Sequence, residues 1–215
     1  MTLITRRTVL AGTASTAAAC SALVPLAAPA FAQESVPVEE LHAPSALGDK
    51  VLGADDAPVT VVEYASMSCP HCASFHKDTW KPFKEKYVDT GKVRFIFREF
   101  PLNPPAYAVS MVARCAPADK YHEIIDLHFQ EQDEWLRSNN PYQALLDRAK
   151  LFGFTQETFD ACLSNQALKD ALDEIRTKAT EQFGVTATPT FFINGVRESG
   201  ALTLGQMEER IDPLL

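Results

Sequence analysis

The sequence predicts one α/β domain, with a mixed central sheet and an inserted all-helical block. Apolar, β-branched runs at residues 59–64 and 93–100 flank an amphipathic segment, which is the pattern of a right-handed βαβ unit. Residues 104–183 contain no strand-like run. Strand composition returns at residues 190–193, and the Asn-Gly sequence at 194–195 predicts an antiparallel hairpin there.

The beginning of the chain has the organisation of a cleavable secretory signal over residues 1–32. Arg6 and Arg7 are the only charges before Glu34, an apolar and small-residue stretch follows them, and the Ala-Phe-Ala sequence at 30–32 predicts cleavage after residue 32. The arginine pair fits either a twin-arginine signal or an ordinary secretory signal, and the sequence leaves this choice open. The mature chain is expected in the periplasm.

Composition restricts the function of the mature chain. Cleavage leaves 183 of 215 residues, enough for one domain with a core, and changes the formal net charge from −8 to −10. An acidic chain without a basic cluster argues against nucleic acid and anionic membrane surfaces as partners. Cys20 leaves with the signal, and an exported chain that keeps an even number of cysteines belongs in an oxidising compartment.

The segment between the signal and the domain is expected to be flexible. Residues 33–50 are polar, contain Pro37 and Pro44, and show no sustained period. The folded domain is therefore expected to span residues 51–215, beginning with a short edge strand at 51–53.

A redox dithiol motif, Cys69-Pro70-His71-Cys72, follows the first buried strand and opens a helix. Cys69 lies at the edge of the first turn, where free N–H groups and the helix dipole favour a thiolate, so we expect it to be the exposed nucleophile. Pro70 fits the first helical position, and a protonated His71 would favour the thiolate further. Cys72 lies one turn further in and should be shielded.

The same cysteine spacing also gives half of a zinc site, but His76 is the only further ligand close by. His76 itself is expected to be a surface or packing histidine of the helix that follows Cys72. Pro82 is expected to kink this helix, because it removes one backbone hydrogen bond.

Glu63 lies in the first buried strand, six residues before Cys69. It is either a strand-end glutamate turned to solvent or a partly buried acid that relays protons to or from Cys72. Burial would raise the pKa of such an acid, which suits the second role. The residues alone do not decide between the two.

The inserted block is expected to contain five helices, at residues 107–115, 119–135, 142–151, 156–163 and 166–183. Cys115 and Cys162 fall on two of them, 47 positions apart. A structural disulfide is expected in an oxidising compartment, with two buried free thiols as the alternative. In the chain-entropy description, such a link stabilises the fold by about 4 kcal/mol.

The chain is expected to end in a strand at 190–193, its antiparallel partner near 196–201 and a helix at 204–211. Pro189 lies just before the first of these strands, and base rates favour a trans peptide bond there.

Together these motifs resemble the DsbA-like thiol–disulfide oxidoreductases, which have a thioredoxin fold with an inserted helical domain. The resemblance extends over residues 51–215. It is carried by five stretches, at residues 57–64, 69–72, 97–102, 184–190 and 192–195.

The resemblance implies a role for each matching residue. Cys69 would be the nucleophile and Cys72 the resolving cysteine, with Pro70-His71 as the dipeptide of strongly oxidising members. Glu63 matches the buried acid of the family, which favours its functional interpretation.

Thr188-Pro189 matches the cis-proline loop of the family, whose backbone at Thr188 would pair with an extended substrate peptide. The expected isomer of Pro189 therefore changes from trans to cis. Cys115 and Cys162 have no counterpart in the best-known members, so their pairing rests on the structural argument alone.

The implied function is that of a periplasmic dithiol oxidase acting on unfolded exported proteins. No cofactor is expected, and a DsbB-type, quinone-linked membrane protein would reoxidise the dithiol. A monomer is expected, because residues 33–50 are too short for the N-terminal region through which reductases and isomerases of this fold assemble.

Two alternatives are kept. The closer one is a disulfide reductase or isomerase on the same fold. The other is a copper or metal module using Cys69, Cys72 and His71 or His76, which would be marked by Met- or His-rich clusters. The methionines of the mature chain are widely spaced, so no metal site is expected.

Overall fold

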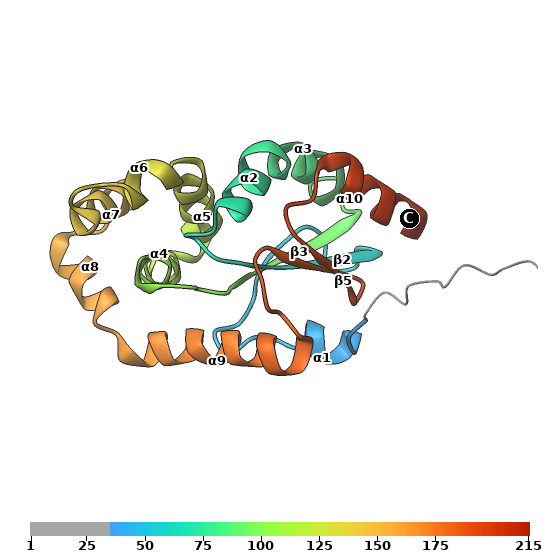
Figure 1. Cartoon of the computed structure of the whole chain (residues 1–215), viewed down its shortest axis with the longest axis horizontal. Coiled ribbons are helices and arrows are strands. Elements are labelled where there is room, and N and C mark those ends of the chain that lie inside the picture. Colours follow the sequence, from blue (N-terminus) through green and yellow to red (C-terminus); the bar gives the residue numbers. More distant parts are fainter. Residues whose placement is uncertain (1–34) are drawn as a thin grey trace, which may run out of the picture. The chain divides into compact units, whose positions relative to one another are not determined.

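The structure is a computed structural model, and it describes residues 35–215. A five-stranded sheet of order β1-β3-β2-β4-β5 organises this part of the chain (Figure 1). The strands are β1 (Lys50–Leu52), β2 (Val59–Ala65), β3 (Val93–Glu99), β4 (Thr190–Ile193) and β5 (Val196–Ser199). β2 and β3 run parallel and the other neighbours antiparallel, which confirms the predicted mixed sheet.

Alternating side chains of the three central strands build a core on each face of the sheet. Val61, Phe95 and Phe191 belong to the core that also contains residues of α2 (Pro70–Asp78), α3 (Trp80–Phe83) and α10 (Leu204–Ile211). Their neighbours Val62, Ile96 and Phe192 pack with α1 (Val38–His42) and α9 (Gln166–Phe183) on the opposite face (Figure 1). The same alternation turns Glu63 toward α2 and Arg98 toward the opposite face.

The helix after the dithiol is broken rather than gently kinked. α2 ends at Asp78, and α3 begins after Thr79, whose φ of −114° departs from helical geometry. The break precedes Pro82, which has no N–H to donate to the carbonyl of Asp78 and whose ring crowds that carbonyl. Thr79 uses its hydroxyl to donate to the carbonyl oxygen of Leu202 at 3.0 Å, which ties the break to the C-terminal part of the chain.

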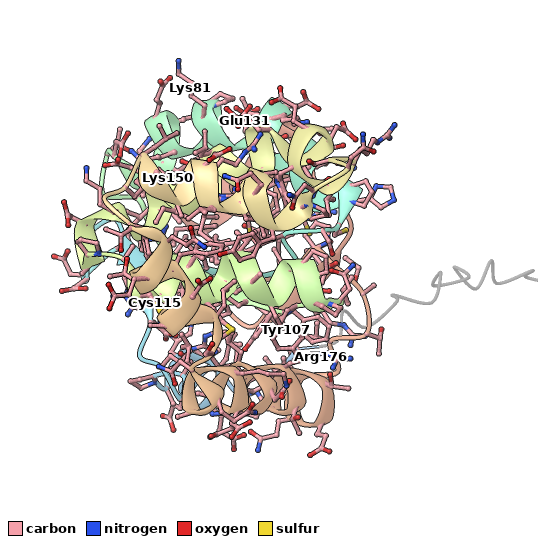
Figure 2. The ribbon with its side chains drawn as sticks, turned by 90° about the vertical axis from the view of Figure 1, so that its left-hand side faces the viewer. Lys81, Tyr107, Cys115, Glu131, Lys150 and Arg176 are labelled. Atoms are coloured by element: carbon pink, nitrogen blue, oxygen red, sulfur yellow. A yellow bond between two sulfur atoms is a disulfide. The ribbon has the colours of Figure 1, made fainter. Side chains whose placement is uncertain are left out.

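The inserted block consists of helices between β3 and β4. They are α4 (Pro104–Cys115), α5 (Tyr121–Gln130), α6 (Gln132–Leu136), α7 (Pro141–Lys150), α8 (Gln156–Leu163) and α9 (Gln166–Phe183). The expected single helix at 119–135 is divided at Glu131, where ψ is 21°. Figure 2 faces the block and shows α4, with Tyr107 and Cys115, running between α9 and the other helices.

The segment expected to be a flexible lead is instead part of the fold from residue 35 onward. Val36 donates its N–H to the carbonyl of Gly195 at 3.0 Å, and the Leu41 side chain is fully buried against the α9 face of the sheet. Periodicity did not reveal this, because α1 is only five residues long and one buried leucine carries its packing. The predicted signal at residues 1–32 lies outside the described residues.

Within residues 35–215, no helix is both long enough and apolar enough to span a bilayer.

Candidate active site

The two cysteines of the motif lie at the N-terminus of α2, directly beyond the carboxyl end of β2. Cys69 is the N-cap residue, in extended conformation, and Pro70 takes the first helical position. Both thiols are free in this structure. Cys69 is 7% exposed and Cys72 is not exposed at all, so Cys69 is the more accessible sulfur, although it is more buried than expected.

Hydrogen bonds around Cys69 favour its thiolate. The Cys72 thiol donates to the Cys69 sulfur, and this outweighs the opposing effect of burial. The side chain of Thr188 and the N–H groups of Cys72 and His71 act in the same direction, and together they lower the pKa of Cys69 to about 5. Cys69 is therefore a thiolate at neutral pH.

His71 lies at the surface of α2. Its identified contribution to the lowered pKa of Cys69 is its backbone N–H. The sequence predicted instead that the charge of its protonated side chain would favour the thiolate.

Cys72 has the opposite environment. Burial raises its pKa well above the usual value, and donation of its S–H to Cys69 and the charge of Glu63 raise the pKa further. In this arrangement the Cys69 thiolate reacts first, and the buried Cys72 thiol stays protonated until the mixed disulfide is resolved.

Glu63 is completely buried beneath the dithiol, on the face of β2 that meets α2. Its Oε2 lies 3.1 Å from Nε2 of His76. Its other oxygen, Oε1, has no hydrogen-bond partner within residues 35–215. The solvent-facing alternative for Glu63 is therefore wrong.

His76 is not a surface histidine, because only 2% of it is exposed and it pairs with the buried acid. Burial lowers its pKa, but the nearby carboxylates of Glu63 and Asp126 outweigh this and raise the pKa to about 9. Sequence reasoning missed this role. The available signal was its spacing of four residues from Cys72, which places both side chains on one helix face.

The cis-proline loop approaches Cys69 from the other side. The Thr188–Pro189 peptide bond is cis, and the carbonyl oxygen of Thr188 lies 3.2 Å from the Cys69 sulfur. This carbonyl accepts from the thiol form, whereas the buried Thr188 hydroxyl, which has no hydrogen-bond partner within residues 35–215, can donate to the thiolate. The carbonyl of Pro189 accepts from the N–H of Gly200 at 2.9 Å, which fixes the loop to the end of the β4–β5 hairpin.

A glutamine of the helical block holds the loop that carries the dithiol. Gln132, at the start of α6, donates from Nε2 to the carbonyls of Met67 and Cys69, at 2.8 and 3.0 Å. The N–H of Cys69 in turn donates to the carbonyl of Ser66 at 3.0 Å. No sequence motif marked Gln132, because its partners are backbone atoms 63 and 65 positions away.

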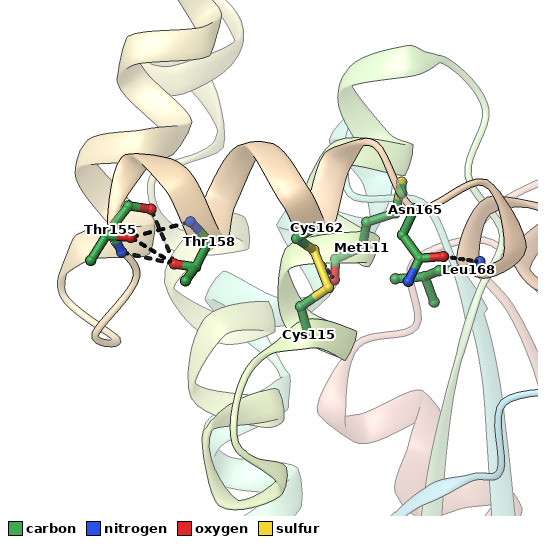
Figure 3. The surroundings of a disulfide bond; sticks show 7 residues. All are labelled: Met111, Cys115, Thr155, Thr158, Cys162, Asn165 and Leu168. Carbon is green, nitrogen blue, oxygen red and sulfur yellow. Dashed lines mark hydrogen bonds between the residues drawn. A yellow bond between two sulfur atoms is a disulfide. The ribbon is translucent and has the colours of Figure 1, made fainter.

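Cys115 and Cys162 are joined by a disulfide between the end of α4 and α8, with their Cα atoms 6.2 Å apart (Figure 3). This bond lies in the helical block, and Cys69 and Cys72 remain the free pair. Within residues 35–215, no group of three or more His, Cys, Asp or Glu side chains is arranged to hold a metal ion.

Comparisons with known proteins point to one family. A family model described as thioredoxin matches residues 45–213. A curated relative from Rickettsia bellii, named "Putative protein-disulfide oxidoreductase", is 37% identical over 153 residues, which cover 69% of this chain and 58% of the relative. The chain thus matches less than two thirds of the length of that relative. Disulfide bond formation protein D of Bacillus subtilis is 27% identical over 160 residues, 70% of each chain.

Solved structures of DsbA-type proteins are similar to this chain in fold. The crystal structure of alpha-DsbA1 from Wolbachia pipientis is 34% identical, has a TM-score of 0.75, and is matched over 83% of this chain and 96% of its own. Oxidised BdbD from Bacillus subtilis, at 23% identity and a TM-score of 0.67, shares the fold.

Proposed function

Because the chain belongs to the DsbA-like thiol–disulfide oxidoreductases of the thioredoxin superfamily, we propose that it is a dithiol oxidase that donates its Cys69–Cys72 disulfide to exported proteins. The mature chain begins after residue 32 and works in the periplasm as a monomer. Its substrates are unfolded exported proteins, and a DsbB-type, quinone-linked membrane protein reoxidises it.

One observation carries this proposal: the pKa of Cys69 is lowered to about 5 while that of Cys72 is raised. The low pKa stabilises the reduced form, in which Cys69 is a thiolate. A protein whose reduced form is stabilised gives its disulfide away readily, and is therefore an oxidant.

The reaction follows from these positions. A substrate thiolate attacks the Cys69 sulfur, the Cys69–Cys72 bond breaks, and its electron pair stays on Cys72. A second substrate thiolate then attacks the substrate sulfur of the mixed disulfide, so that the substrate leaves oxidised and Cys69 leaves as a thiolate. The backbone of Thr188 pairs with an extended substrate segment beside the dithiol, and the position of its carbonyl next to the Cys69 sulfur supports this role.

The test is an equilibrium titration of the mature protein in glutathione buffers, with the Cys69–Cys72 state read by mass after thiol tagging. The expected midpoint is more oxidising than about −180 mV, the value typical of disulfide isomerases. A more reducing midpoint would contradict the oxidase and favour a reductase or isomerase. Cys115→Ala/Cys162→Ala is titrated in parallel, so that the second disulfide cannot be mistaken for the first.

A trapping experiment tests the order of attack. Reduced Cys72→Ser, offered an unfolded substrate protein whose cysteines carry activated mixed disulfides, should accumulate a mixed disulfide through Cys69: the Cys69 thiolate displaces the activating thiol, and the resolving thiol is gone. Cys69→Ser is the matched control and should accumulate none. Equal trapping by the two variants would contradict the assignment of Cys69 as nucleophile.

A further inference from the structure

His76 lies between two carboxylates, one buried and one at the surface. Its Nε2 is 3.1 Å from Oε2 of Glu63, and its Nδ1 is 3.5 Å from Oδ1 of Asp126. Glu63 is fully buried, whereas the Asp126 side chain, on α5, is 41% exposed. The three side chains therefore form a line of titratable groups from the interior to solvent.

Aromatic side chains fix the imidazole in this orientation. Phe129 stacks on His76 with ring centroids 4.1 Å apart and an interplanar angle of 17°. Trp80 contacts the same ring and donates from Nε1 to Oδ2 of Asp126 at 3.3 Å. Both nitrogens of His76 are thus held toward carboxylates, and neither can turn away without breaking this packing.

The other charged groups around His76 do not compete for its protons. Glu63 faces it from β2 and Asp126 from α5, while Cys72 lies one turn earlier on α2. His122, also on α5, has its pKa lowered to about 4 by burial and is neutral at pH 7. His76 is therefore the cation between the two carboxylates.

Glu63, at the inner end of this line, is close enough to affect the charge of the Cys72 sulfur, which must change its protonation state during the reaction. Glu63 acts electrostatically on Cys72, and its free Oε1 is the carboxylate oxygen not engaged by His76. When the Cys69–Cys72 bond breaks, Cys72 receives the electron pair and must take up one proton. When the bond forms again, the Cys72 thiol must release one proton before its sulfur attacks Cys69. Cys72 itself is 0% exposed and cannot exchange this proton with water directly.

On the basis of the proposed function, in which Glu63 is the buried acid of the family beside Cys72, we propose that His76 and Asp126 extend the proton path from Glu63 to solvent during disulfide exchange. Glu63 exchanges the proton with Cys72. His76 is the relay, because an imidazole can release a proton from one ring nitrogen and take one up at the other. Asp126 is the outer group, and a small shift of its exposed side chain closes the 3.5 Å distance to His76.

The step to measure is resolution of the mixed disulfide between Cys69 and glutathione by Cys72. Reduced mature protein is mixed with oxidised glutathione, quenched with acid at intervals, and analysed by mass over pH 5–9. Deprotonation of Cys72 precedes attack, so this rate reports the proton path. The variants are His76→Gln and Asp126→Asn. Asp119→Asn, at a 75% exposed aspartate before α5, is the control for the loss of one surface charge.

We expect His76→Gln to slow resolution at pH 7 by at least about tenfold, with a rate that rises steeply with pH as hydroxide replaces the internal base. Asp126→Asn keeps the acceptor for Trp80 but loses the exchangeable proton, and is expected to slow resolution about threefold with the same change in pH profile. Asp126→Glu should restore the wild-type profile. A structural role for Asp126 would leave the profile of Asp126→Asn unchanged.

A folded His76→Gln or Asp126→Asn with the rate and pH profile of the wild type overturns the proposal. If His76→Gln does not fold, Asp126→Asn decides alone, since its side chain is at the surface. Failure of the oxidase function gives a different result: the glutathione titration of the wild-type protein would have a midpoint more reducing than about −180 mV, whatever the resolution rates of the variants.

Discussion

Two sulfur atoms three residues apart in this protein have opposite protonation preferences. The Cys72 thiol, the Thr188 side chain and two backbone N–H groups favour the thiolate of Cys69, whereas burial and the nearby charge of Glu63 act against the thiolate of Cys72. The hydrogen bond between the two sulfurs and the burial of Cys72 contribute most to this difference, and the β2 acid and the cis-proline loop add to it. The asymmetry is thus a property of three elements, not of the motif alone.

This asymmetry predicts how the stability difference between the reduced and oxidised protein depends on pH. The pKa of Cys69 is about 5 in the folded protein against an ordinary value of 9.0, so its contribution is fully present above about pH 9 and is lost as pH falls toward 5. The reduced form should therefore gain stability over the oxidised form between pH 5 and 9. Thermal unfolding of both forms across this range measures the difference.

The oxidised protein serves as the internal reference for this measurement. His76, whose raised pKa of about 9 adds stability below pH 6.5 that is lost as pH rises through 9, titrates in both forms and largely cancels. Reduced Cys69→Ser should lose the pH-dependent gain, and the thiolate absorbance of the wild type should titrate near pH 5. A reduced form that gains nothing from pH 5 to 9 would contradict the assigned environment of Cys69.

Site residues that belong to a sequence motif could be predicted from the sequence. Site residues that reach the site only through tertiary packing could not. Cys69 and Cys72 are marked by their spacing, and Glu63 only by the family resemblance, because its residue pattern alone left its role open. Gln132 acts on backbone atoms far away in the chain, and Asp126 gains its place only because α5 packs beside α2. Neither contact leaves a local pattern in the sequence.

At the scale of elements, the boundaries predicted from capping and strand signals hold best. The hairpin at Asn194-Gly195 and the helix start at residue 156, which Thr155 caps, are where local chemistry places them. The kink expected from Pro82 is present at Thr79, whereas the break at Glu131 was missed, because it divides an apolar face that remains continuous on both sides. Periodicity detects the buried face and does not detect a change in axis direction.

The capping box of α8 gives a prediction at this scale. Thr155 and Thr158 exchange hydrogen bonds between side chain and backbone, at 3.1 and 2.9 Å (Figure 3). Thr155→Ala should lower the free energy of unfolding by about 1 kcal/mol, because the N–H of Thr158 loses its acceptor. Thr180→Ala, the same change at an exposed interior position of α9, should be close to neutral. Urea unfolding compares the two, and equal losses would argue against the cap.

The Cys115–Cys162 disulfide gives a second prediction, because it links α4 and α8 over a sequence separation of 47. Cys115→Ala/Cys162→Ala should lower the free energy of unfolding by about 4 kcal/mol, since the unfolded chain regains the entropy of an open loop. The comparison belongs in a Cys69→Ala/Cys72→Ala background, so that only one disulfide differs. Denaturant unfolding with an unchanged midpoint would show that this bond does not stabilise the fold.

At the scale of the whole domain, one buried arginine of the sheet is among the contacts that hold the segment before β1. Arg98, 2% exposed, donates to both carboxylate oxygens of Asp49 at 3.1 and 2.8 Å. It also donates to the hydroxyl of Tyr64 and to the carbonyl of Ala43, each at 2.9 Å. Polar composition suggested a flexible lead, but these polar groups satisfy a buried cation, and so the segment is ordered by the domain it precedes.

Replacement of Asp49 tests this fastening against a matched pair on the same strand. Asp49→Ala leaves the buried Arg98 guanidinium without its carboxylate and should lower the free energy of unfolding by about 3 kcal/mol. Asp55 pairs with Arg94 at 3.9 Å and is 98% exposed, so Asp55→Ala should cost no more than about 0.5 kcal/mol. Urea unfolding of the two variants measures both values. Hydrogen exchange should show that residues 35–48 lose more protection in Asp49→Ala than in Asp55→Ala, because Arg98 is one of their attachments to the sheet. Equal protection in the two variants would mean that the backbone and apolar contacts of Val36 and Leu41 hold the segment without Arg98.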